Sequence, residues 1–435
     1  MGGATFSEPG LTSFCRLDGL GLVVVGQRAE PGEAVLACEP VERDDWCRRC
    51  GCQGRVRDTL TRVLAHEPFG WRPTRLRVRL RRYRCTECGH VWRQDLSAAA
   101  APRSRLSRRA VWWALGSLVI GHVSMSRVAA GLGVAWSTAS KAVLTEARRL
   151  LVDDPDRFGG VRVLGVDEHC WRHTRKGGKW VTVVIDLAPV RDQTGPARLL
   201  DMVEGRSKAV LKDWPDARPQ AWRDQVEVVA MDGFTGYKTA TTENLPEAVA
   251  VMDPFHVVQL ASGAVHQCRR RVQQTLHGHR GRTTDPLYRA RQTLTTRTRF
   301  LTDKQKTRLD ELLADNDHVE VEATWAVYQR LVAAYQHPSR ATGKATIQAL
   351  IDSLATGVPT ALTEVRTLGR TLARRADDIL AYFDRPHTTN GPTEAINGRL
   401  EHLRGTALGF RSIDSYITRC LLEAGGPRPQ LHPLL

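Results

Sequence analysis

At 435 residues the chain is long enough for two to four domains, and its 42% of apolar residues can bury substantial cores. Lysine and arginine outnumber the acids by 63 to 47, a formal charge of +16 that favours a polyanionic partner. No run approaches the roughly 18 uncharged apolar residues of a membrane span, and no charged-then-apolar signal peptide begins the chain. We therefore expect a cytoplasmic protein with no membrane partner.

The N-terminal region carries most of the positive charge. Residues 55–109 contain 15 arginines and 4 acids. Before them, two short apolar runs, 22–25 and 34–37, flank Pro31-Gly32 and predict a small hairpin.

Two pairs of cysteines follow the hairpin, each with two residues between its members. In a cytoplasmic protein such spacing favours a metal over disulfides, and four thiolates complete a tetrahedral site for one structural Zn²⁺. We predict a zinc-ribbon DNA-binding domain over 1–97. Its ligands are Cys47, Cys50, Cys85 and Cys88. A disulfide pair remains an alternative, and Cys52 and His90 are lower-ranked ligands.

Between the two pairs, residues 74–84 alternate aliphatic side chains with arginine. As a strand, this pattern buries one face and presents guanidinium groups on the other. That face suits DNA phosphates, although a solvated arginine face is the alternative. The candidate DNA-binding residues are Arg75, Arg77, Arg79 and Arg81.

An alanine-rich linker, 97–102, leads to a helical region over 103–152. Residues 126–141 predict a helix capped by Ser126, a glycine-containing turn and a second helix. This pattern resembles a helix-turn-helix whose second helix enters the major groove, and an ordinary helical hairpin is the alternative. The candidate contacts on the second helix are Trp136, Ser137, Thr138, Ser140 and Lys141.

The next segment returns to strands. Runs at 161–167, 179–186 and 197–203 are joined by short glycine-containing links and should be antiparallel neighbours. A helical stretch, 207–225, then leads to a strand ending at Asp232, which such a crossover makes parallel to the first strand. A fifth strand follows at 248–252. This order predicts an α/β domain with a ribonuclease-H-like mixed sheet.

Three acids in this region could form one site. Asp167 lies near the centre of a buried strand, where a carboxylate is costly unless a cation accepts it. Asp232 ends a second strand, and Glu394 follows Asn390-Gly391-Pro392 in the first turn of a helix. Two aspartates and a glutamate are the oxygen ligands that a two-metal phosphoryl-transfer site requires. The competing carboxylates are Asp186, Asp253 and Glu401.

The 161 residues between Asp232 and Glu394 are far more than the one strand and one helix that such a fold needs before its third carboxylate. We predict an all-helical insertion over 257–385, which divides the catalytic domain into 160–256 and 386–424. Its Arg269-Arg270-Arg271 cluster either contacts DNA or forms a solvated helix face.

The helix from Thr393 is amphipathic, and a loose proline-rich tail follows from Gly425. Its apolar face comprises Ile396, Leu400, Leu403 and Ala407. Its polar stripe comprises Glu394, Asn397, Glu401 and Arg404. Asn397 and Arg404 are therefore candidates to support phosphate or metal beside Glu394, with Arg399 as the alternative to Arg404.

Together these features resemble the DDE transposases of bacterial insertion sequences, specifically the ISL-type group. The resemblance rests on the cysteine pairs before the helix-turn-helix and on five further motifs. These are Leu164-Gly165-Val166-Asp167-Glu168, Met231-Asp232-Gly233-Phe234, Asp253-Pro254-Phe255-His256, residues 389–397 and Gly409-Phe410-Arg411.

The resemblance implies that Asp167, Asp232 and Glu394 are catalytic and hold two Mg²⁺ or Mn²⁺ ions. It implies terminal inverted repeats and target DNA as double-stranded partners, and location in the bacterial cytoplasm, on the nucleoid when bound. Because two ends must be joined, we expect a homo-oligomer on DNA. His256 matches a motif of the family, and a structural hydrogen bond is its default role. The alternatives are a non-catalytic DNA-binding regulator and a nuclease that does not transfer strands.

Overall fold

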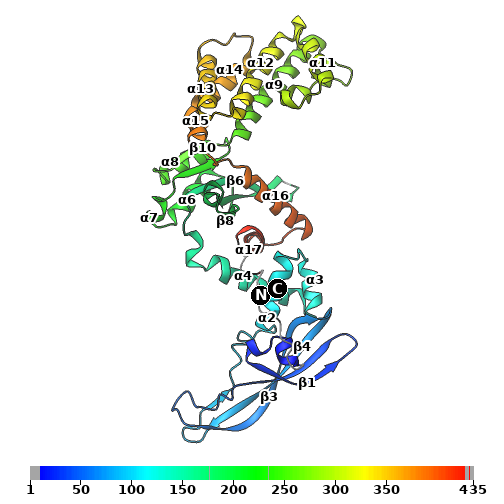
Figure 1. Cartoon of the computed structure of the whole chain (residues 1–435), viewed down its shortest axis with the longest axis vertical. Helices are drawn as coiled ribbons and strands as arrows, with labels where there is room; N and C mark the ends of the chain where they lie inside the picture. The colour runs from blue at the N-terminus through cyan, green and yellow to red at the C-terminus, as the bar shows by residue number, and fades with distance from the viewer. Residues whose placement is uncertain (1–9, 176, 234, 427–430, 432–435) are drawn as a thin grey trace, which may run out of the picture. The chain divides into compact units, whose positions relative to one another are not determined.

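The computed structural model describes residues 10–175, 177–233, 235–426 and 431. The chain separates into two compact units, Met1–Arg157 with Leu400–Leu435, and Phe158–Arg399 (Figure 1). Phe234 of the second motif and most of the tail predicted to be loose lie outside the described residues.

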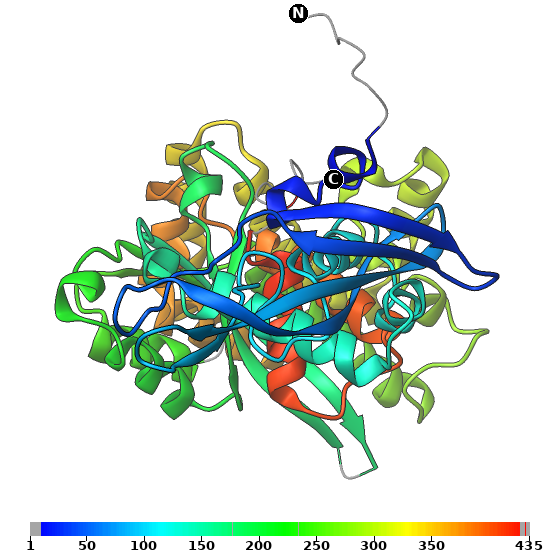
Figure 2. The same ribbon diagram turned by 90° about the horizontal axis from the view of Figure 1, so that it is seen from below.

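The first unit contains a five-stranded sheet in the order β1-β2-β4-β3, with β5 paired to β4 (Figure 2). A short helix, α1 (Leu11–Phe14), precedes it. The strands are β1 (Leu22–Ala29), β2 (Ala34–Pro40), β3 (Gly54–Phe69), β4 (Arg72–Cys85) and β5 (Val91–Arg93). The β1–β2 pair confirms the predicted hairpin. In β4, Leu76, Val78 and Leu80 are fully buried, so the predicted alternation is also confirmed.

Helices complete this unit. They are α2 (Arg108–Val119), α3 (Met125–Gly131), α4 (Trp136–Ala147) and α17 (Ile413–Ala424). The predicted cap was wrong: α3 begins at Met125, so Ser124 rather than Ser126 caps it, accepting a hydrogen bond from the Arg127 amide at 3.4 Å. The sequence-based division put α17 in the catalytic domain, whereas in the structure Leu422 of α17 joins the core of α2–α4.

The second unit is built on a mixed sheet in the order β10-β9-β6-β7-β8. Its strands are β6 (Val163–Thr174), β7 (Gly177–Asp186), β8 (Arg198–Glu204), β9 (Val228–Met231) and β10 (Val249–Met252). β6, β7 and β8 are antiparallel and β9 is parallel to β6, as predicted. β10 pairs in parallel with β9, a direction that the sequence did not predict. This arrangement is compatible with a ribonuclease-H-like domain.

Helices pack on both faces of this sheet. They are α5 (Ala188–Arg191), α6 (Lys208–Asp216), α7 (Gln220–Arg223), α8 (Thr235–Asn244) and α16 (Gly391–Thr406). Trp214 of α6 and Tyr237 of α8 pack with Leu164 and Val166 of β6 on one face. On the opposite face, a Cβ added at Gly165 would lie 2.5 Å from Oγ1 of Thr393, so glycine allows α16 to approach β6 closely. Asp167 shares the face of Gly165, because side chains alternate along a strand.

Between β10 and α16 the chain is helical. The helices are α9 (Pro254–His277), α10 (Pro286–Arg289), α11 (Asp303–Leu313), α12 (Val319–Gln336), α13 (Arg340–Thr356), α14 (Thr363–Arg374) and α15 (Ala376–Asp384). Every residue from 254 to 384 is described and none lies in a strand. These helices share one hydrophobic core, which includes Val265, Leu331 and Leu350. In the described part of the chain, none of the helices has the length and apolar character needed to cross a bilayer.

Candidate active site and metal centres

The four paired cysteines meet in the first unit. One sulfur from each of Cys47, Cys50, Cys85 and Cys88 lies within 4.8 Å of the others, with 3.4 Å between those of Cys50 and Cys85. A tetrahedral ion with Zn–S bonds of about 2.3 Å places sulfurs about 3.8 Å apart. All ten cysteines are free, which disfavours the disulfide alternative. The four sulfurs therefore fit one tetrahedral metal ion.

The backbone folds each cysteine pair into a tight turn. The Cys47 amide donates to the Cys52 carbonyl and the Cys85 amide to that of His90, both at 2.8 Å. The backbone amide of Cys88 is the largest cause that lowers the pKa of the Cys85 thiol, to about 6, while the hydrogen bond between the sulfurs of Cys88 and Cys50 raises the pKa of the Cys88 thiol to about 12. The sulfur of Cys52 and the ring of His90 are not in the cluster.

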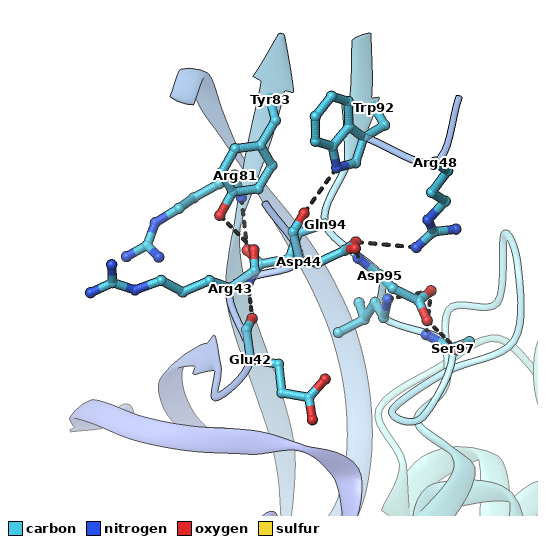
Figure 3. Close-up of polar contacts among 11 residues, drawn as sticks. Glu42, Arg43, Asp44, Arg48, Arg81, Tyr83, Trp92, Gln94, Asp95 and Ser97 are labelled. Carbon is cyan, nitrogen blue, oxygen red and sulfur yellow. Dashed lines mark hydrogen bonds and ion pairs between the residues drawn. The ribbon is translucent and has the colours of Figure 1, made fainter. Parts of the chain in front are cut away.

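Aromatic and polar side chains attach the segment before Cys47 to β4 and β5 (Figure 3). Tyr83 donates to the Arg43 carbonyl at 2.5 Å and Trp92 to the Asp44 carbonyl at 2.9 Å. The two rings stack with centroids 5.6 Å apart. The backbone amide of Gln94 donates to the Arg81 carbonyl at 2.9 Å, and the Arg81 amide donates to the side-chain oxygen of Gln94 at 3.1 Å. The cysteine cluster is therefore supported by its own small core.

The arginine row of β4 is only partly available to DNA. Arg75 pairs with Glu33 at 3.1 Å and also donates to the Gly133 carbonyl, so it holds the turn between α3 and α4. Arg79 and Arg81 both pair with Glu39, at 3.5 and 3.6 Å. Arg77 is exposed and has no ion pair within the described residues.

The second helix of the predicted helix-turn-helix begins at Trp136, as expected. Trp136, Ser137 and Lys141 are exposed, and Thr138 is half-buried. Ser140 is only 8% exposed and faces Thr418 of α17 across a groove of about 310 Å³. Burial therefore makes Ser140 the weakest of the five candidates for contact with a base.

Asp167 lies in a crowded and largely buried environment. Its Oδ1 accepts a hydrogen bond from the Glu168 amide at 2.8 Å, and its Oδ2 accepts one from the Asn397 side chain at 2.9 Å. Burial is the main cause that raises the pKa of Asp167 to about 6, and the charges of Asp232 and Glu394 raise it further. Asp232 and Glu394 therefore both lie close enough to Asp167 for their charges to act on it, while the three acids do not form one group of ligand atoms within 4.8 Å among the described residues.

The histidine of α9 also belongs to this site. Ligand atoms of His256, Glu394 and Asp253 lie within 4.8 Å of one another, a spacing that could hold a metal ion. The Nε2 of His256 and the Oδ1 of Asn397 are buried without a hydrogen-bond partner among the described residues. Several polar atoms therefore converge here with unused bonding capacity.

The competing carboxylates have other partners. Asp186 is 2% exposed, pairs with Arg198 at 2.9 Å and accepts the Ala188 amide. Asp253 is 1% exposed and accepts bonds from the Thr389 hydroxyl and from the amides of Asn390 and Phe255, so it caps α9 and fixes the start of α16. Glu401 pairs with Arg404.

Comparison with known proteins identifies the family. A family model described as a transposase, of the ISL3 type of DDE transposase, matches residues 164–420. The chain belongs to the ISL3-type DDE transposases. It is 28% identical over 302 residues to the transposase of insertion sequence IS1001 from Bordetella parapertussis, covering 68% of this chain and 70% of that protein. It is 27% identical over 328 residues to the IS1557 transposase of Mycobacterium tuberculosis, covering 68% of each chain.

Among the positioning residues of this transposase that we did not predict is Asn390. It is fully buried and donates from its side chain to the Val166 carbonyl at 3.3 Å, next to Asp167 on β6. Its Oδ1 accepts from the Thr393 hydroxyl at 2.6 Å. The Asn-Gly-Pro sequence signalled a turn, but the partner 224 residues away gave no local signal.

The helical insertion of the transposase also reaches the site. Arg375 is 4% exposed, pairs with Asp378 at 2.5 Å and donates to the Gly233 carbonyl at 3.0 Å. Asp378 in turn pairs with Lys238 of α8 at 2.9 Å. This buried network holds the backbone directly after Asp232.

Proposed function

We propose that this transposase binds the terminal inverted repeats of an insertion sequence, cleaves DNA at the element end and transfers the freed strand to target DNA. The observation that supports the proposal is the placement of Asp167 on β6, Asp232 after β9 and Glu394 on α16, where the charges of Asp232 and Glu394 act on Asp167. The raised pKa of Asp167 accompanies it. A carboxylate buried among other acids is stable as an anion only with a cation nearby.

The donor set fits Mg²⁺ or Mn²⁺, two ions in all, because carboxylate oxygens are the preferred ligands of such cations. We propose Asp167, Asp232 and Glu394 as their ligands. His256 is an additional donor, because its ligand atom and that of Asp253 lie within 4.8 Å of a carboxylate oxygen of Glu394. When bound, two such ions supply activation of the attacking oxygen and stabilisation of the leaving oxygen. Zn²⁺ in the cysteine cluster would have a structural role only.

The chain's own residues position the reaction. The Asn397 amide orients Asp167, and Asp253 anchors the start of the helix that carries Glu394. Water attacks the phosphorus at the element end, and the 3′ oxygen leaves and takes up a proton. That 3′ hydroxyl then attacks a phosphodiester of the target in line; the bond from phosphorus to the target's own 3′ oxygen breaks, and that oxygen leaves and takes up the proton that the attacking hydroxyl releases.

DNA recognition is assigned to the first unit. The exposed Trp136, Ser137 and Lys141 of α4 would contact the major groove, with Arg77 on backbone phosphates. We propose a homo-oligomer on DNA in the cytoplasm, because strand transfer joins two ends. A DNA-binding regulator without catalysis is the second candidate.

The test is cleavage and joining of labelled DNA that carries the inverted repeats flanking the gene, in Mg²⁺ and in Mn²⁺. We expect joined products from the wild type and none from Asp232→Asn. Glu401→Gln is the matched control and should retain cleavage, because Glu401 pairs with Arg404. Tight binding by the wild type without cutting would favour the regulator, and cutting without joining would favour a nuclease.

A further inference from the structure

The helical insertion of the second unit carries a long stretch of unbalanced positive charge. Residues 269–299 contain nine arginines and one acid, Asp285. Six of these arginines are exposed: Arg270, Arg280, Arg282, Arg289, Arg297 and Arg299. This segment comprises the end of α9, the loop after it, α10 and the turns that lead to α11.

Among the described residues, acids form ion pairs with only one of these nine arginines. Arg271 pairs with Glu364 at 2.8 Å and also pairs with Glu320, so its role is structural. The other eight make no ion pair with an acid among the described residues. Asp285 accepts hydrogen bonds from the Arg282 amide at 2.7 Å and from the Gln273 side chain at 3.2 Å. Its carboxylate therefore stabilises the conformation of the loop after α9.

Arg269 is the most informative member. It is 5% exposed, it donates to the Gln273 side chain, and its Nε has no hydrogen-bond partner among the described residues. Its guanidinium lies 5.8 Å from the centre of the Tyr288 ring, and that of Arg291 lies 4.3 Å from the same ring. Burial lowers the pKa of Arg269, and the charges of Arg270 and Arg291 lower it further.

A buried guanidinium beside like charges is unfavourable in the free protein. An anion between Arg269, Arg270 and Arg291 would remove the penalty, and the planar guanidinium suits phosphate. The surrounding exposed arginines extend the same charge over a surface much larger than one phosphate ion. A surface of this size and charge suits a ligand with many phosphates in a row.

We propose that residues 269–299 of the insertion form a second DNA-binding surface that grips the backbone phosphates of duplex DNA. The inference rests on the proposed function as a transposase. It adds a contact, independent of base sequence, from the unit that carries the catalytic acids.

The first test uses the full-length protein and a fluorescent duplex carrying the inverted repeat and its flanking DNA. Affinity is measured by anisotropy between about 50 and 200 mM salt. The variant is Arg270→Ala/Arg282→Ala/Arg289→Ala. The matched control, Arg308→Ala/Arg366→Ala/Arg370→Ala, removes the same charge from exposed positions on α11 and α14.

We expect the slope of log affinity against log salt to fall by about 0.9 for each lost phosphate contact, or by about 2.7 for all three, and to stay unchanged in the control. Equal slopes in the wild type and the variant, or equal losses in the variant and the control, would overturn the inference. Normal strand transfer by the wild type in that case would leave the proposed function intact.

The second test is Arg269→Met, which removes the buried charge and keeps the apolar stem. We expect an unchanged or higher Tm without DNA and at least several-fold weaker DNA binding. A lower Tm with unchanged DNA affinity would make Arg269 purely structural and overturn the inference. Stabilisation of the wild type by inorganic phosphate, with no effect of either variant on DNA binding, would indicate a small-anion site and overturn it as well.

Discussion

Asp167, which we propose as a metal ligand, occupies a position where its charge lowers the stability of the folded protein. Its strand neighbours Val166 and Leu164 are buried, and the charge of His256 lowers the pKa of Asp167 less than burial raises it. The hydrogen bonds from Glu168 and Asn397 offset only part of the cost of burying the charge. Metal binding and folding should therefore be linked at this residue.

At residue scale, we predict that metal-free Asp167→Asn is more stable than the wild type above pH 6. The folded pKa of about 6 lies above the ordinary aspartate value of 3.8, so the folded state binds more protons than the unfolded state between these pH values. Wild-type stability should then fall as pH rises from about 4 to about 6, by at most about 3 kcal/mol. Thermal unfolding in chelator at several pH values measures this.

Adding Mg²⁺ should raise the Tm of the wild type more than that of Asp167→Asn. Asp186→Asn is the control, because that carboxylate is paired with Arg198, and the variant should be destabilised at neutral pH. If Asp167→Asn were less stable than the wild type in chelator at pH 8, the prediction would be wrong. Groups within the protein would then stabilise the ionised carboxylate of Asp167.

At the scale of elements, the two cysteine turns depend on each other because each supplies two of the four sulfurs that would bind one metal ion. We predict that Cys85→Ser, or removal of metal by a chelator, unfolds the segment around β5 while the mixed sheet of the second unit remains folded. Trp92, stacked on Tyr83, should then become more exposed and shift its fluorescence to the red. DNA binding should weaken by at least about tenfold, since structural zinc contributes folding energy directly.

Cys52→Ser is the matched control, because the sulfur of Cys52 lies outside the cluster. Equal metal content in the Cys85 and Cys52 variants, measured by atomic absorption, would contradict the four-cysteine site.

The insertion and the catalytic sheet are coupled through Arg375. We predict that Arg375→Lys lowers the cleavage rate about 10- to 100-fold, since a lysine keeps the charge near Asp378 but loses the planar fork that also reaches Gly233. Hydrogen exchange at residues 232–237 should increase. Arg374→Lys, an exposed neighbour, should change neither quantity. A slow variant with unchanged exchange would place the effect of Arg375 elsewhere.

At the scale of the whole molecule, the C-terminal segment belongs to the same unit as the N-terminal sheet and helices. Leu422 is 1% exposed within the core of α2–α4. We predict that Leu422→Ala destabilises this unit by about 2–5 kcal/mol through the cavity it leaves. Hydrogen exchange should rise in α2 and α4 and stay unchanged in β6 and β9.

Leu350→Ala in the core of the insertion should show the reverse pattern, because Leu350 packs only within the second unit. Loss of protection in β6 on replacing Leu422 would show that α17 stabilises the catalytic sheet instead.

The sequence by itself determined the directions of β6, β7, β8 and β9, the helical stretch before α16, the cysteine pairs and the start of the second helix at Trp136. These follow from spacing and periodicity along one segment, which require no knowledge of distant partners. For the same reason, Asp167, Asp232 and Glu394 could be chosen as candidates from their positions at strands and a helix start.

Only the tertiary structure decided which polar groups are already engaged. Arg75 binds Glu33 and the turn before α4, Ser140 is buried beside a groove that α17 also lines, and Asp253 fixes the start of α16. It also brought Arg375 to Gly233, across 142 residues. A side chain's periodicity shows which face it occupies, but its partner depends on segments that become neighbours only when the chain folds.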